Sequence, residues 1–366
     1  MYRVNLVKII TLLLLTVTIS VNAQHEASKS AQVEKSHSEE GGDFKAEIHK
    51  DIRHHVKDAY EFVFFSNSKT GTHYGFSLPV ILIDNGLHVF MASKFNQGES
   101  LVHIGGAYYK LYHSKIYKTD ASGEIHYNEK HFVSNEKPLD LSITKGVVSI
   151  FIVGVLLFLI FTSLAKSYVK NGAIPKGIGR FFEPIVLYVR DEIAIPNIGE
   201  EHYKKYMSYL LTIFFFIWFS NLLGLTPFGI NITGNIAVTF VLALFTFVIT
   251  QFSGNKNYWK HIFWMPGVPT PMKIILAPIE LLGVFIKPFA LMIRLYANMS
   301  AGHIVIYSLL GLMFIFHSII GSSFSFILAF LISILELLVA ILQAYIFTIL
   351  SALYFGFAVE EHAEEH

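Results

Sequence analysis

The stretch PIELLGVFIKPFALMIRLYANMSAGH, residues 278–303, decides how this chain folds and what it can do. It is largely apolar, yet it carries Glu280, Lys287 and Arg294, each seven residues after the last. On an α-helix that spacing places the three side chains on one face, two turns apart. A permanent cation at the centre of a membrane helix costs about 2.5–3.5 kcal/mol on insertion scales, so such residues mark functional sites. An arginine near a helix end can instead extend to the headgroups, but apolar sequence continues well past Arg294.

Small residues accompany the charged face. Gly283, Ala290, Ala297 and Ala301 lie on or beside it, and Asn298 follows Arg294 by one turn. Small side chains let another helix approach closely inside a membrane. We therefore expect a polar, close-packing stripe on an otherwise apolar helix, facing a polar cavity or a partner.

This segment closely resembles the corresponding helix of the F-type ATP synthase A chain family, the membrane stator subunit. The resemblance covers roughly residues 145–366 and includes NLLGLTPF at 221–228 and ILQAYIFTIL at 341–350. Its most specific part is an arginine followed by L-[YF]-[AG]-N-M-x-A-G, which here ends at Gly302. The resemblance implies two long, steeply tilted helices against a rotor ring of small helical-hairpin subunits, with a peripheral-stalk subunit as a second partner. It also implies a non-catalytic proton-channel subunit of a larger ATP synthase.

Composition sets the broad class. The chain has 366 residues, 53% of them hydrophobic, and a formal net charge of +1. Uncharged stretches longer than about 18 residues indicate a polytopic membrane protein. Without cysteine there is neither a disulfide nor a thiolate metal site, and we expect no metal or cofactor. The near-neutral charge gives no reason to expect nucleic acid, and both phosphate-loop motifs are absent, so we expect no bound nucleotide.

Residues 1–23 have the pattern of a signal peptide. Arg3 and Lys8 precede an apolar run over 9–17, and a small-residue cleavage site ends the segment at Ala23. A short first membrane anchor is the alternative. Either way, the sequence that follows is expected to be exported. Residues 24–58 are polar and partly disordered by composition, and their histidines fit a solvated helix better than a metal site.

Residues 59–137 predict a small exported domain that contains β-strands. Two apolar runs, 80–83 and 87–90, flank Asp84-Asn85-Gly86, a hairpin signal with Asn-Gly as a type I′ turn. Two further alternating runs, 108–117 and 125–133, are separated by a second turn at 120–123. The sequence does not indicate what this domain does.

Residues 138–366 predict the membrane stator domain. Its helices are expected at 147–165, 206–226, 236–253, 272–317 and 324–357. The uninterrupted apolar runs of the last two are each about 45 Å long, against roughly 30 Å of hydrocarbon, so these helices must tilt or bend. Pro278 and Pro288 predict an interruption or bend in the fourth helix, and Gly321-Ser322-Ser323 predicts the turn before the fifth.

The fold class is therefore mainly α. The chain is a polytopic membrane protein with about five membrane helices, the last two long and tilted, plus a small exported β-rich N-terminal domain. The connection between the first two helices carries seven basic residues: Lys166, Lys170, Lys176, Arg180, Arg190, Lys204 and Lys205. By the positive-inside rule it is cytoplasmic, which agrees with an exported N-terminus and a cytoplasmic C-terminus in a bacterial inner membrane. Residues 183–196 are amphipathic and are expected at the membrane interface.

A second polar pattern lies on the last helix. Glu336 and Gln343 are seven residues apart and share a face. His303, nine residues after Arg294 and roughly opposite it around the helix, is the most plausible partner of Glu336. The two could form a proton relay, with a structural ion pair as the alternative. In the family an acid is often found at the position of His303 and a histidine at that of Glu336, so the two types are exchanged here. Gly224 also departs from members that carry a carboxylate there.

The resemblance implies a mechanism. Protons enter from the exported side near Asn298, His303, Glu336 and Gln343, load a rotor carboxylate, and leave near Glu280. Arg294 faces the unprotonated carboxylate and blocks direct leakage. The supporting polar or packing residues are Lys287, Asn221, Ala297, Ala301 and Gly302.

Two other functions fit the sequence less well than that of a proton-channel subunit. A secondary ion transporter with an exported sensor domain would usually show an internal repeat, and none is found. A membrane-anchored binding protein would leave the intramembrane Arg, His and Glu unexplained.

Overall fold

The computed structural model describes residues 58–67, 72–98, 100–129, 132–171, 177–226, 230–265, 268–315 and 319–360. The predicted signal peptide and residues 24–57 lie outside these ranges. The chain divides into two compact units, one of residues 1–151 with 223–232 and one of residues 152–222 with 233–366.

The strands of the first unit form three small antiparallel sheets. β1 (Glu61–Asn67) pairs with β2 (Thr72–Ser77). β3 (Pro79–Ile83) lies between β4 (Leu87–Met91) and β8 (Leu139–Asp140), and a 3-10 helix, η3 (Ala92–Gly98), follows β4. β6 (Ala107–Tyr112) lies between β5 (Val102–Ile104) and β7 (Lys115–Thr119). The core contains strand residues whose side chains point to the inner face, because successive strand side chains point to opposite faces: Val80, Leu82, Phe90, Val102 and Tyr109. Phe95 of η3 packs with them.

The turn between β3 and β4 is held by a charged residue. The Tyr109 hydroxyl donates a hydrogen bond to Asp84 over 2.9 Å, and the Lys118 ammonium pairs with the same carboxylate oxygen at 2.8 Å. These hydrogen bonds lower the pKa of Asp84, and burial together with the Asp84 carboxylate raises the pKa of Tyr109 to about 12. The carboxylate therefore joins the β3–β4 turn to β6 and β7.

The strand predictions are correct at the hairpin and wrong further along. At 84–86 both Asn85 and Gly86 have positive φ, although the pairing of Ile83 with Leu87 leaves three residues in the turn rather than two. Residues 108–117 form the hairpin β6–β7 rather than one strand, because His113 and Ser114 turn the chain at positive φ. In the described part of 125–133 the only pairing is a bridge between Tyr127 and Val133.

The first unit also contains the start of α3 (Lys145–Asn171). The first turns of a helix leave backbone N–H groups without partners. Here the Asp58 carboxylate accepts a hydrogen bond from the Gly146 N–H at 2.9 Å, and the Lys145 N–H donates to the Ala59 carbonyl at 2.8 Å. A residue 88 positions earlier thus caps the helix and fastens the strands to it.

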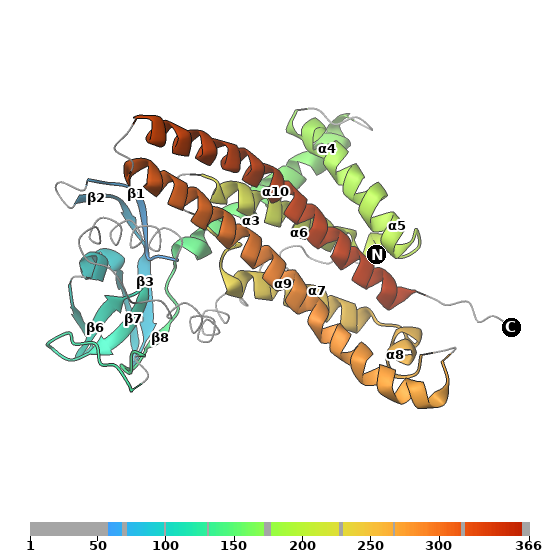
Figure 1. Ribbon diagram of the computed structural model, residues 1–366, viewed down its shortest axis with the longest axis horizontal. Helices are drawn as coiled ribbons and strands as arrows, with labels where there is room; N and C mark the ends of the chain where they lie inside the picture. Colours follow the sequence, from blue (N-terminus) through green and yellow to red (C-terminus); the bar gives the residue numbers. More distant parts are fainter. Residues whose placement is uncertain are drawn as a thin grey trace. The chain divides into compact units, whose positions relative to one another are not determined.

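Five helices in the described residues are long and apolar enough to cross a membrane. Besides α3 they are α6 (Tyr203–Gly224), α7 (Ile236–Ser253), α9 (Thr270–Ile315) and α10 (Ile319–Val359). In the second unit α9 and α10 run side by side (Figure 1). The predicted mainly α fold class with about five membrane helices is confirmed.

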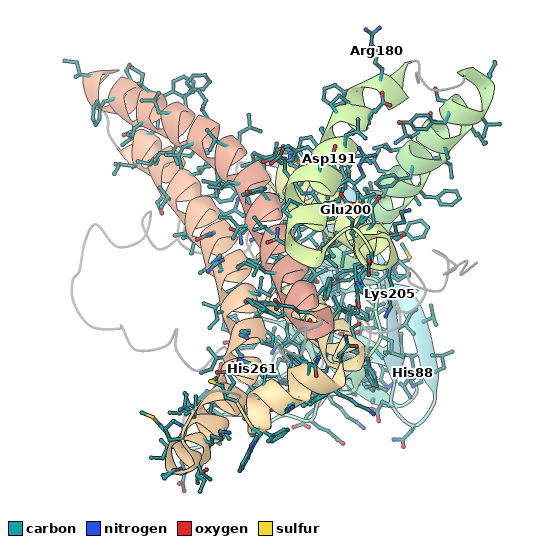
Figure 2. All side chains as sticks on the ribbon, turned by 90° about the vertical axis from the view of Figure 1, so that its right-hand side faces the viewer. His88, Arg180, Asp191, Glu200, Lys205 and His261 are labelled. Carbon is teal, nitrogen blue, oxygen red and sulfur yellow. The ribbon has the colours of Figure 1, made fainter. Side chains whose placement is uncertain are left out.

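Shorter helices join these spans. The predicted amphipathic segment 183–196 lies in α4 (Ile178–Tyr188), a π-helical turn, η4 (Val189–Ala194), and α5 (Ile195–Ile198). α8 (Lys256–Phe263) follows α7. At the start of α4, Arg180 projects away from the neighbouring helices (Figure 2).

Two details of the long helices correct the sequence analysis. α9 is continuous through Pro278 and Pro288, so of the predicted interruption or bend the interruption is not present. Gly321-Ser322-Ser323 lies inside α10, so the turn predicted there is also wrong, and the connection falls between Ile315 and Ile319. In lipid, backbone polar groups must be satisfied within the segment, which favours helix even through proline, glycine and serine.

Candidate functional site

Arg294 lies on an open face of α9. Its side chain is exposed, as are the small residues Ala290, Ala297 and Ala301. Within the described part of the chain, no acidic side chain pairs with Arg294, and its charge reaches the hydroxyl of Tyr354 on α10. A guanidinium surrounded by small side chains leaves room for another helix to contact it directly.

The opposite face of α9 contains a buried polar cluster. His303 and Glu336 are each only 5% exposed, on α9 and α10 respectively. The Glu336 carboxylate packs against Gly302, where a Cβ atom would overlap its Oε1. The Tyr307 ring lies 6.2 Å from the His303 ring and within electrostatic range of Glu336. We call Gly302, His303, Tyr307 and Glu336 the buried cluster.

Two members of the buried cluster, His303 and Glu336, have polar atoms without hydrogen-bond partners in the described part of the chain. In the described residues, His303 Nε2 and both carboxylate oxygens of Glu336 have no hydrogen-bond partner. Buried polar atoms normally have partners, and isolated ones cost roughly 1–3 kcal/mol each in protein mutational data. The predicted neighbourhood of His303 and Glu336 is thus present, but they form no direct ion pair, and the relay stays a prediction.

Asn298 and Gln343 connect α9 to α10 between Arg294 and the buried cluster. The Asn298 amide donates to Gln343 Oε1 at 2.9 Å. Gln343 is 4% exposed, whereas Asn298 is exposed at the surface beside Arg294. The pair therefore offers hydrogen-bonding groups from the Arg294 face toward the interior.

Asn221 has a packing role. Its side chain is buried, donates to the Ala340 carbonyl of α10 at 3.3 Å and accepts from the Thr233 hydroxyl at 2.6 Å. Both halves of its amide are used. It joins α6 to α10 and to the residues before α7.

A second polar region lies on the N-terminal side of Arg294 along α9. A small cavity between α7, α8, α9 and α10 is lined partly by polar side chains: Thr246, Thr250, Gln251, Tyr258, Lys287 and Tyr354. The Lys287 ammonium lies 5.7 Å from the Tyr354 ring centroid, and Glu280 is within electrostatic range of Tyr258. Gln251 donates to the Tyr258 hydroxyl at 3.2 Å.

The predicted site residues thus divide into two groups. Asn298, His303, Glu336 and Gln343 lie in or beside the buried cluster, whereas Lys287 and Glu280 lie on the other side of Arg294. At 1.5 Å per residue, Glu280 and His303 are about 34 Å apart along α9.

Several residues of these regions were not predicted from the sequence. Tyr307 follows His303 by one turn, so helical spacing could have found it. Tyr258, Gln251 and Tyr354 come from three other helices, and no periodicity brings them together.

Comparison with known proteins identifies the family. The family described as ATP synthase A chain matches residues 147–356, and one described as a domain of unknown function matches residues 51–141. ATP synthase subunit a 2 of Chlorobaculum tepidum is 49% identical over 235 residues, which cover 62% of this chain and 66% of that protein.

Two further relatives agree. ATP synthase subunit a of Chloroherpeton thalassium is 46% identical over 62% of this chain and 70% of its own length. That of Myxococcus xanthus is 45% identical over 62% of this chain and 78% of its own. These matches confirm the resemblance predicted from residues 278–303 and do not favour a secondary transporter. The chain belongs to the ATP synthase A chain family, and it is a multi-pass membrane protein.

Proposed function

We propose that the chain is the stator subunit of an F-type ATP synthase that forms two half-channels for protons against the rotor ring. Through them it couples proton translocation to rotation and ATP synthesis, while the ATP chemistry belongs to the rest of the complex. One observation carries the proposal. An exposed Arg294 separates two polar regions along α9, the buried cluster on one side and the Lys287 cavity on the other.

The face of Arg294 suits a rotor surface. An arginine turned toward lipid is costly, whereas a rotor carboxylate would pair with it. Ala290, Ala297 and Ala301 are exposed and small, so rotor helices can pass close to the guanidinium. The partner is therefore a ring of small helical hairpins that each carry one carboxylate.

The buried cluster suits the path by which protons enter. Polar groups without protein partners in a buried site are the positions that water or a proton can occupy. Among the residues that the structure describes, His303 Nε2 and both Glu336 oxygens lack such partners, and the Asn298–Gln343 hydrogen bond lies between them and the Arg294 face. Histidine and glutamate can each take up and release a proton within the range set by their surroundings.

The Lys287 cavity suits the path by which protons leave. Its polar groups lie among four helices, and Glu280 is within electrostatic range of Tyr258, which lines the cavity. Between the two paths Arg294 acts as a block, because a guanidinium is not deprotonated in proteins and cannot carry the proton through. A proton therefore crosses only on the rotor.

The topology follows from charge. We place residues 1–23 as a signal peptide, residues 24–58 and the 59–137 domain outside a bacterial inner membrane, and the 138–366 domain within it. Seven basic residues lie at the end of α3, between α3 and α6, or at the start of α6, and the projecting Arg180 is one of them (Figure 2). By the positive-inside rule they favour a cytoplasmic position for that connection. The C-terminus is then cytoplasmic as well, and the same side offers the surface for a peripheral-stalk subunit.

The test is the substitution Arg294→Ala in the assembled complex. ATP-driven acidification of inverted vesicles should be lost, and Arg294→Lys should not restore it fully, because lysine can deprotonate and lacks the planar fork. The matched control is Arg180→Ala, an exposed arginine outside both polar regions. Assembly is checked by co-purification of the rotor ring. Acidification at wild-type rates in either Arg294 variant contradicts the proposal.

A further inference from the structure

The sheet formed by β4, β3 and β8 is apolar on both faces. Its inner face contributes Val80, Leu82 and Phe90 to the core. An antiparallel sheet with one face in water alternates between apolar residues inside and polar residues outside. The outer positions of these strands are instead aliphatic: Ile83 is 41% exposed, Leu87 67%, Val89 60% and Met91 45%.

The same face continues along β8. Leu139 lies directly opposite Ile83, which in turn lies opposite Leu87, so the three side chains form a row across the sheet. Leu139 and Leu141 are exposed by 43% and 37%. We call Ile83, Leu87, Val89, Met91, Leu139 and Leu141 the outer patch.

The polar residues between these leucines point inward. Asp140 accepts a hydrogen bond from the Tyr60 hydroxyl, and the Ser142 hydroxyl accepts one from the Ile81 N–H at 3.0 Å. The pattern along 139–142 is therefore the reverse of that of a strand facing water. Such a reversal indicates that the medium outside this face is apolar.

The outer patch is joined directly to a membrane helix. The Leu141 and Ile143 N–H groups donate to the carbonyls of Ile81 and Pro79, so the chain stays attached to β3 until α3 begins at Lys145. From Gly146 onward α3 carries no charge until Lys166. Leu141 is five residues before Gly146, at most about 18 Å along an extended chain. The first residues of the apolar span are thus within reach of the patch.

We propose that the outer patch rests in the interfacial layer of the membrane, in contact with phospholipid headgroups and the upper acyl chains. Three observations select lipid as the occupant. The patch is wholly aliphatic, it is continuous with the start of a helix already in the bilayer, and Asp58 and Ala59 bind the first residues of that helix, which holds the sheet at the membrane boundary. The proposal concerns the strand domain and depends only on α3 crossing the membrane.

The absence of cysteine permits a direct test in the full-length protein in lipid nanodiscs. Single cysteines at Val89→Cys and Leu87→Cys receive a nitroxide label, and its collision rates with oxygen and with a water-soluble nickel chelate are measured. Ala121→Cys, in an exposed turn of the same domain, is the water-facing control. Leu159→Cys, 58% exposed on α3, is the lipid-facing reference.

We expect the oxygen-to-nickel collision ratio at both patch positions to exceed that at Ala121 several-fold and to approach that at Leu159. A low ratio with frequent nickel collisions means that the patch faces water, and low collision rates with both reagents mean that protein covers it. Either result overturns the proposal. If Leu159 itself is accessible to nickel, the error lies in the membrane position of α3 rather than in the patch.

Discussion

Asn221 on α6 and Glu336 on α10 are both buried polar residues, but their hydrogen bonding differs. The Asn221 amide donates to the carbonyl of Ala340, one turn beyond Glu336, and accepts from Thr233. The Glu336 carboxylate, against Gly302, has no hydrogen-bond partner among the described residues. A fully used amide ties helices together, whereas an unused carboxylate in the same apolar surroundings is available to a proton. Under the proposed function, the contrast separates polar groups that hold the bundle from polar groups that would handle the transported proton.

The largest effect on proton pumping is expected from substitutions of His303 and Glu336. Glu336→Gln and His303→Gln should each lower ATP-driven proton pumping by at least about tenfold while the complex still assembles, because the ionisable group is removed and a side chain of similar size remains. The exchange His303→Glu with Glu336→His should retain more activity than either single exchange. A double-mutant cycle on pumping rates measures the coupling. Additive losses would show that the two residues act independently, and the relay would have to be abandoned.

The next effect concerns the contact between the carboxylate and the helix backbone. Gly302→Ala places a Cβ where Glu336 Oε1 now lies, so the carboxylate must move and pumping should fall several-fold. Adding Glu336→Asp, which is shorter by one methylene, should recover part of the loss. Gly154→Ala in α3 is the matched control, since a Cβ there meets nothing within 4 Å. Equal pumping in the Gly302 and Gly154 variants would mean that the carboxylate position does not matter.

For the hydrogen-bonded residue of the comparison, Asn221→Ala should lower the stability of the complex. It removes the hydrogen bond from Thr233 and leaves that hydroxyl buried, a loss of about 1–3 kcal/mol. The thermal midpoint of the purified complex should drop, and pumping per assembled complex should stay near the wild-type rate. A normal midpoint with lost pumping would move Asn221 into the proton path and remove the contrast drawn above.

The smallest effect extends the comparison to a satisfied carboxylate outside the membrane. Asp84 is hydrogen bonded to Tyr109 and Lys118, which lowers its pKa in the folded state. Its contribution to stability is therefore present above the unfolded-state value of about 3.9 and is lost as the pH falls through the lower folded value. Hydrogen exchange of the β3–β4 amides in the full chain should accelerate over that acidic range. In Asp84→Asn the exchange should already be faster at neutral pH and should depend less on acid.

The sequence predicted the membrane helices well because their signal is local. A long uncharged run between charged residues must be a helix in lipid, whatever its neighbours are. The same rule explains why α9 is not interrupted at Pro278 and Pro288, and why the turn predicted at Gly321-Ser322-Ser323 is wrong. At these positions the need of backbone polar groups for partners within the segment outweighs the local preference of proline, glycine and serine for a break.

The candidate site was predictable where one helix or a strong motif carried it. Arg294 and His303 fall on opposite faces of α9, as their spacing of nine residues requires. The contact of Glu336 with Gly302 and the cavity around Lys287 depend on how several helices pack. The β6–β7 turn at His113-Ser114 was missed because neither residue is a typical one for positive φ.

The cap of α3 has a consequence for how the protein is made. Asp58 leaves the ribosome long before Gly146, yet the hydrogen bond between them closes a loop that contains every strand of the β1–β8 domain. The first turn of α3 is therefore capped only after residues 58–146 have all been synthesised. In the topology proposed above, this loop must also cross the membrane before the cap can form.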